Sequence, residues 1–119
     1  MEENCVNFTR DCPLAGDVKK KAEIMRKENA KSNLENLIGK TILEEIKMGE
    51  NRGERSIFVL IECACCKGIH ELCKEDVNTV LGKILSILRN RGFKADYLYK
   101  YKYEMMIQRV NFYISWDND

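Results

Sequence analysis

The sequence predicts an α+β fold in which two helices pack on one face of a three-stranded sheet. Apolar residues recur every three or four positions over residues 34–46 and again over 77–88, which is typical of amphipathic helices. Residues 56–61 form a continuous apolar run, and residues 93–101 and 110–116 alternate between apolar and polar, as strands do. The resulting element order is helix, strand, helix, strand, strand.

The chain length of 119 residues suits one domain. Residues 1–16 show little periodicity and contain the only proline, Pro13, followed closely by Gly16. We therefore expect an irregular N-terminal arm over residues 1–16 and a single α+β domain over residues 17–119.

The first helix is predicted between Asp17 and about Met48, where helix-forming residues predominate. Ser32 and Glu35 have the spacing of a capping box, so the helix either begins at Asp17 or restarts at Ser32. Its apolar stripe consists of Leu34, Leu37, Ile38, Thr41, Ile42 and Ile46. A stripe of this kind has to be buried against another element.

The second helix follows the first strand and a cysteine-rich connection. Its apolar residues are Val77, Val80, Leu81, Ile84 and Leu88. It is expected to end at Arg89–Gly92, because cations stabilise a helix C-terminus and glycine readily adopts the left-handed cap conformation.

The sheet is expected to be mixed. The run Ser56–Ile61 is apolar on both faces, which favours a position inside the sheet or cover on both sides. The crossover through the second helix predicts that the first two strands are parallel, and a hairpin around Lys102 to Met105 makes the last strand antiparallel. One face stays open, with Phe58, Leu60 and some of the tyrosines on it, and such a surface favours self-association or docking.

The segment from about residue 34 to residue 116 resembles a class of small proteins common in tailed bacteriophages and prophages. The resemblance rests on turn and packing positions, namely Gly53, Ser56, Leu88, Gly92, Phe93, Ile114, Ser115 and Trp116. It implies a viral accessory or virion component, located in the virion or in the cytoplasm of a host cell.

Charge and composition narrow the range of partners. The formal net charge is +1, so we expect no nucleic acid and no membrane as partners. The segment Tyr97–Tyr103 alternates tyrosine and lysine, as in some single-strand nucleic-acid platforms, but alternation places the rings and the cations on opposite faces. An edge strand with lysines that block further pairing is the better interpretation.

Four of the six cysteines and the only histidine lie close together in the sequence. The candidate zinc ligands are Cys63, Cys65, Cys66, His70 and Cys73. Thiolates and imidazole suit a tetrahedral structural zinc site, although the spacing departs from that of a standard finger. Two alternatives remain open. In one, Cys63, Cys65 and Cys73 are small buried apolar side chains, with Cys66 and His70 in the loop. In the other, Cys66 or Cys73 is a reactive thiol activated by Lys67, His70 or the following helix N-terminus.

No catalytic motif occurs elsewhere in the sequence, so we expect a non-enzymatic binding protein without a cofactor. The first interpretation is a small virion structural or assembly component that forms homo-oligomers or binds virion proteins. The alternative is a zinc-stabilised regulatory or anti-defence accessory protein.

Overall fold

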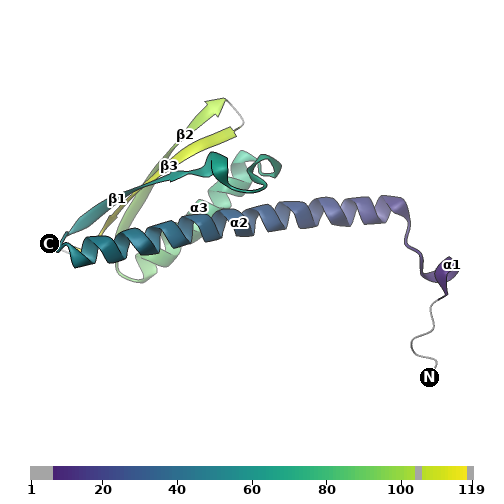
Figure 1. Ribbon diagram of the computed structural model, residues 1–119, viewed down its shortest axis with the longest axis horizontal. Helices are drawn as coiled ribbons and strands as arrows, with labels where there is room; N and C mark the ends of the chain where they lie inside the picture. Colours follow the sequence, from purple (N-terminus) through teal and green to yellow (C-terminus); the bar gives the residue numbers. More distant parts are fainter. Residues whose placement is uncertain (1–6, 104–105, 118–119) are drawn as a thin grey trace, which may run out of the picture.

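The computed structural model describes residues 7–103 and 106–117, and the side-chain burial of residues 7–98 and 109–117. The elements, labelled in part in Figure 1, are α1 (Phe8–Asp11), α2 (Ala15–Asn51), β1 (Ser56–Glu62), the 3-10 turns η1 (Cys63–Cys65) and η2 (Ile69–Glu71), α3 (Lys74–Asn90), β2 (Lys94–Tyr103) and β3 (Met106–Ser115). The α+β class and the order of the long helices and the strands are as predicted.

The sheet is antiparallel, which corrects the predicted mixed sheet. The strand order is β1-β3-β2, and β3 pairs antiparallel with both neighbours. β1 and β2 therefore run in the same direction but are separated by β3. The central position suits β3 because Val110, Phe112 and Ile114 are fully buried there, and a central strand can pair its backbone on both sides. The predicted hairpin turn falls largely on residues 104–105, outside the described residues.

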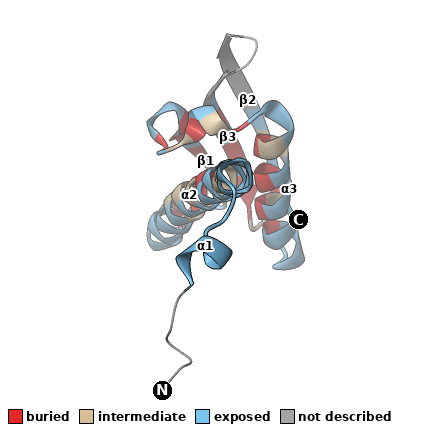
Figure 2. Ribbon diagram, turned by 90° about the vertical axis from the view of Figure 1, so that its right-hand side faces the viewer, coloured by how far each residue is buried: buried red, intermediate tan, exposed pale blue. Residues whose placement is uncertain are grey.

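β1 is an edge strand, so the interior position predicted for it is wrong. Its inward side chains Ile57, Val59 and Ile61 are buried, whereas Phe58 is 77% exposed and Leu60 is 52% exposed. The helices cover only one face of the sheet (Figure 2). The strand is apolar on both faces, but only one of them is buried, and the other is open.

The helices pack side by side beneath the sheet. α2 packs against β1, α3 packs against β2, and the two helices also contact one another. Leu34, Ile38 and Ile42 are buried, which confirms the core stripe predicted for the first helix. α2 is continuous from Ala15, so the capping-box spacing at Ser32 starts no new helix.

The N-terminal part of α2 projects away from the sheet, toward the purple end of the helix in Figure 1. Described side chains from residue 15 to residue 26 are exposed, apart from the partly exposed Ala22. Three of the exposed side chains are large and apolar, namely Val18, Ile24 and Met25. The long axis of the molecule, 67 Å, reflects this projecting helix and the segment before it.

The predicted end of the second helix is confirmed. Gly92 has a φ of +92°, in the left-handed region. Its amide donates to the carbonyl of Arg89 at 3.1 Å, and the amide of Phe93 donates to the carbonyl of Leu88 at 3.1 Å. These two bonds form a Schellman motif, which satisfies the last carbonyls of α3 and directs the chain into β2.

Candidate functional site

The predicted zinc ligands lie along the connection from β1 to α3, but the structure divides them between core and surface. Cys63 and Cys66 are buried in the hydrophobic core. Cys65 and Cys73 are exposed, and the side chain of His70 is exposed as well. The loop therefore does not turn all five side chains toward one point.

Burial changes the pKa of the two buried thiols, Cys63 and Cys66. Desolvation raises the pKa of Cys63 to about 12, and burial also raises the pKa of Cys66. Both groups remain thiols at neutral pH, and the thiolate is the form that acts as nucleophile or metal ligand. Packing as small apolar side chains accounts for Cys63, as expected, and for Cys66, which was expected in the loop. The burial expected for Cys65 and Cys73 is wrong, because both side chains are exposed.

The described residues contain no group of three His, Cys, Asp or Glu side chains arranged to hold a metal ion. A zinc site made from this loop would require the exposed Cys65 and His70 to turn toward the buried thiols. Zinc binding by the cysteine loop stays a prediction, and its test is given below.

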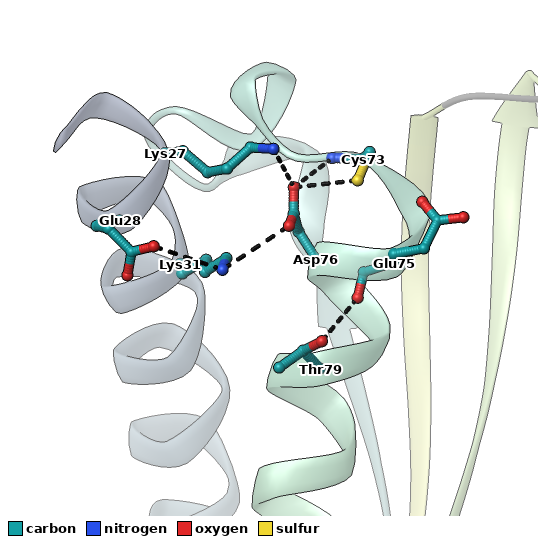
Figure 3. A network of polar contacts seen from close by, with 7 residues as sticks. All are labelled: Lys27, Glu28, Lys31, Cys73, Glu75, Asp76 and Thr79. Atoms are coloured by element: carbon teal, nitrogen blue, oxygen red, sulfur yellow. Dashed lines mark hydrogen bonds and ion pairs between the residues drawn. The ribbon is translucent and has the colours of Figure 1, made fainter. Parts of the chain in front are cut away.

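Cys73 belongs to a helix cap that also links the two long helices (Figure 3). Its backbone amide and its Sγ donate to Oδ2 of Asp76 at 3.0 Å and 3.1 Å. The ammonium of Lys27 lies 3.2 Å from the same oxygen, and Lys31 lies 3.8 Å from Oδ1. The carboxylate thus caps the N-terminus of α3 and attracts two cations from α2.

The balance of forces on Asp76 favours its charged form. Desolvation pushes its pKa upward, but the two hydrogen bonds from Cys73 and the ion pair with Lys27 outweigh it and hold the pKa at about 2. The cap therefore carries a full negative charge at neutral pH. Its geometry indicates a structural role.

The middle of the cysteine loop is fixed on α2. The side-chain amide of Asn33 donates to the carbonyl of Lys67 at 3.2 Å. Gly68 has a φ of +82°, and a Cβ at this position would lie 3.1 Å from Cβ of Ala30. Glycine is thus favoured both by the backbone conformation and by the close approach to the helix.

The open face of the sheet carries a cluster of exposed apolar side chains. We define the open-face cluster as Phe58, Leu60, Leu98 and Tyr113. Leu98 is 79% exposed and Tyr113 is 40% exposed. The rings of Phe58 and Tyr113 pack with centroids 5.1 Å apart. The cluster spans all three strands.

The strand register arranges this face in rows. Phe58, Tyr113 and Asp96 form one row, and Leu60, Asn111 and Leu98 form the next. The next row runs from Glu62 through Arg109 to Lys100, and Glu62 pairs with Arg109 at 3.0 Å. The apolar side chains thus occupy two rows together with Asp96 and Asn111, and the ion pair between Glu62 and Arg109 lies in the third row.

A second apolar surface lies between α2 and α3. Ile42, Leu43, Ile84 and Ile87 line a shallow groove of about 300 Å³ there. The groove is crossed at one side by an ion pair between Lys83 and Glu35, with N–O distance 2.6 Å.

Sequence reasoning predicted the exposure of Phe58 and Leu60 but missed Leu98. Leu98 occupies one of the polar positions of the alternating pattern in β2, and it is the only apolar residue at those positions. A leucine at a polar position of this pattern was the sequence feature that could have predicted an exposed apolar side chain. Tyr97, in contrast, packs on Phe112 on the helix side, and the side chains of Tyr99, Tyr101 and Tyr103 lie outside the described residues.

Within the described residues, no helix has the length and apolar character needed to cross a membrane. No protein-family profile, curated protein or solved structure matches the chain.

Proposed function

We propose that this protein is a non-enzymatic binding protein that associates with a second copy of itself through the open-face cluster. The observation that carries the proposal is the gathering of four exposed apolar side chains, Phe58, Leu60, Leu98 and Tyr113, on the face that no helix covers. Self-association agrees with the virion or assembly role that the sequence resemblance implies.

The face can meet the same face of a second copy about a two-fold axis that runs along β3. Rotation about this axis lays β1 of one copy over β2 of the other, which makes an isologous interface. Leu60 then meets Leu98 of the partner subunit, because these two residues share a row of the register. By the same rule Phe58 meets Asp96 of the partner subunit, and Arg109, which is near the axis, faces its own copy. The Glu62 carboxylate 3.0 Å from each Arg109 offsets these like charges.

The size of the face sets the expected strength of the association. Three strands about 4.8 Å apart, each with seven residues rising about 3.3 Å, make a plane of roughly 23 by 14 Å. A standard interface buries about 800 Å² on each partner, more than twice this plan area. We therefore expect a weak and reversible dimer.

Sedimentation velocity over a range of protein concentrations tests the proposal. The wild-type protein should shift toward a dimer as concentration rises, and Leu98→Lys should remain a monomer. Leu43→Lys is the matched control, because Leu43 is a similarly exposed leucine on α2. A wild-type protein that stays monomeric up to millimolar concentration, or a dimer that Leu43→Lys dissolves and Leu98→Lys does not, would contradict it.

A further inference from the structure

The two edges of the sheet differ in how they resist pairing with another strand. Lys94, Asp96 and Lys100 interrupt the β2 edge, and its register with β3 shifts on both sides of Tyr101. Charged residues and irregular register are the features that protect an edge strand. The β2 edge is therefore protected.

The β1 edge has none of these features. Ser56–Glu62 pairs with β3 in seven consecutive register positions without a shift. It contains no lysine and no proline, and its only charged residue is the last one. A regular apolar edge of this kind presents a row of backbone donors and acceptors to any extended chain.

We propose that the free edge of β1 binds an extended segment of a protein partner as an added antiparallel strand, with an acidic residue of that segment lying near Lys40 and Lys67. The edge supplies backbone hydrogen bonds, and alternate side chains of the segment lie beside Phe58 and Leu60. The inference goes beyond self-association, because backbone groups at the edge of β1 carry the binding, although the segment also flanks Phe58 and Leu60 of the open-face cluster.

The position of α2 decides between an extended segment and a second copy of β1. Ile57, Val59 and Ile61 are buried because α2 lies against β1. In a two-fold pairing of β1 strands about 4.8 Å apart, the α2 helix packed on each strand must also fit beside its own copy, and packed helices need about 8–10 Å. A single extended segment has no helix beneath it and avoids this requirement.

A hollow continues the β1 edge past its C-terminal end. Leu37, Lys40, Cys65 and Lys67 are among its lining residues, and its volume is about 340 Å³. Leu37 and Lys40 lie on the flank of α2 away from α3, since Gly39 and Leu43 line the groove on the α3 side. The outer side of β1 and the hollow are therefore on the same side of the molecule.

Charge in the hollow favours an acidic group. Within the described residues, neither Lys40 nor Lys67 has a carboxylate within ion-pair distance. Both ammonium groups are available to a carboxylate on the segment. This positive charge determines the direction of the bound segment: the end that carries its acidic residue lies near the η1 turn.

The chain itself supplies a probe for the edge. A capped peptide that copies residues 54–62 can pair antiparallel with β1 so that its Val59 lies opposite Val59 of the protein. In this register Phe58 faces the peptide's Leu60, Ile57 faces its Ile61, and the peptide's Glu54 reaches the position opposite Ala64, at the start of the hollow. The peptide carries no helix.

Amide hydrogen exchange of the full-length protein, at a concentration below its own association, gives the direct readout. The peptide should slow exchange of the β1 amides that point away from β3 by at least about tenfold, since free edge amides become hydrogen-bonded. The same peptide with N-methyl groups on the amides that face β1 should give no protection. Leu98→Lys, which removes the open-face contact, should leave peptide binding unchanged.

Protein variants test the acidic end of the segment. Lys40→Glu should weaken peptide binding by about two- to fivefold, the usual range for a partly exposed ion pair. Lys20→Glu, on the projecting part of α2, is the matched control and should have no effect. A peptide with lysine in place of Glu54 should bind Lys40→Glu better than it binds the wild-type protein.

Three results would overturn the proposal: no protection of β1 amides at millimolar peptide, equal binding of the N-methylated peptide, or protection on β2 instead of β1. Concentration-dependent protection of β1 amides in the protein alone would show that a second copy occupies the edge, and would also reject the proposal. Loss of dimerisation in Leu98→Lys with peptide binding retained separates this site from the open-face cluster.

Discussion

At the scale of single residues, Gly49 is the glycine at which the described structure leaves least room for a side chain. A Cβ built there would lie 2.7 Å from Cγ2 of Ile57 and 2.9 Å from Cη2 of Trp116. Trp116 also packs edge-to-face on Phe93, with ring centroids 6.4 Å apart. The glycine therefore permits the last turns of α2 to approach both β1 and the end of β3.

Replacing Gly49 with alanine should lower the free energy of unfolding by about 1–3 kcal/mol, because the added methyl group overpacks this contact. Gly39→Ala is the control, since a Cβ at Gly39 meets nothing within 4 Å. That variant should be neutral or more stable, as alanine favours the helix by up to about 1 kcal/mol. Urea denaturation measures both, and a stabilising effect of Gly49→Ala would show that the contact is looser than described.

Asp76 is the second residue with a testable effect, and its effect depends on pH. Its pKa of about 2 is below the ordinary value of 3.8, so its contribution to stability is present above about pH 4 and is lost as the pH falls through 2. Asp76→Asn should lower the free energy of unfolding by about 1–2 kcal/mol at pH 7. The difference between wild type and variant should shrink as the pH falls below 4 and disappear below about pH 2.

Glu28→Gln is the control for Asp76, because Glu28 is exposed and forms one ion pair, with Lys31 at 3.6 Å. Its substitution should change stability by less than about 0.5 kcal/mol. A loss from Asp76→Asn that persists unchanged at pH 2 would mean that the amide disturbs packing and that charge is not responsible.

At the scale of elements, the projecting part of α2 contributes little to the folded core. The first described side chains of α2 that reach the rest of the fold through ion pairs are Arg26, with Glu71 at 3.8 Å, and Lys27, with Asp76 at 3.2 Å. Most helical stability in proteins comes from tertiary packing, which the earlier turns lack.

Removal of residues 1–24 should therefore change the free energy of unfolding by less than about 1 kcal/mol, as judged by urea denaturation. Amides of residues 15–24 in the intact chain should exchange faster than those of residues 34–46. A large loss of stability on truncation would indicate that the projecting turns are held by contacts absent from this structure.

The sequence predicted elements better than their arrangement. Periodicity located the core stripe through Leu34, Ile38 and Ile42, and the Gly92 signal located the end of α3, because both are local properties of the chain. Strand order depends on which strand gains the most free energy of folding from the central position in the sheet. That comparison involves β1 and β3, which lie about fifty residues apart in sequence, and local patterns do not encode it.

The candidate site was predictable only in part, for the same reason. The apolar pattern of β1 placed Phe58 and Leu60 on an open face, but Leu98 joined them only once the register of β2 with β3 was known. The composition of residues 63–73, with four cysteines and the only histidine, predicted a candidate metal site. Burial of Cys63 and Cys66 and exposure of Cys65 and His70 depend on how the loop packs on α2.

At the scale of the whole molecule, the zinc hypothesis and the packing interpretation give opposite results. The described loop geometry predicts that a chelator leaves the melting temperature unchanged and that the intact protein shows no bound metal in a native mass spectrum under reducing conditions. A fall in melting temperature on chelation, abolished by Cys66→Ser, would establish a structural metal site and require the loop to rearrange.

The central claim is that the open face of the sheet is the self-association surface. The most direct measurement follows backbone amide chemical shifts of the isotopically labelled protein as it is diluted. The account predicts concentration-dependent shifts centred on Phe58, Leu60, Leu98 and Tyr113, and their loss in Leu98→Lys. Shifts confined to the groove between α2 and α3, or no shifts up to millimolar concentration, would contradict it.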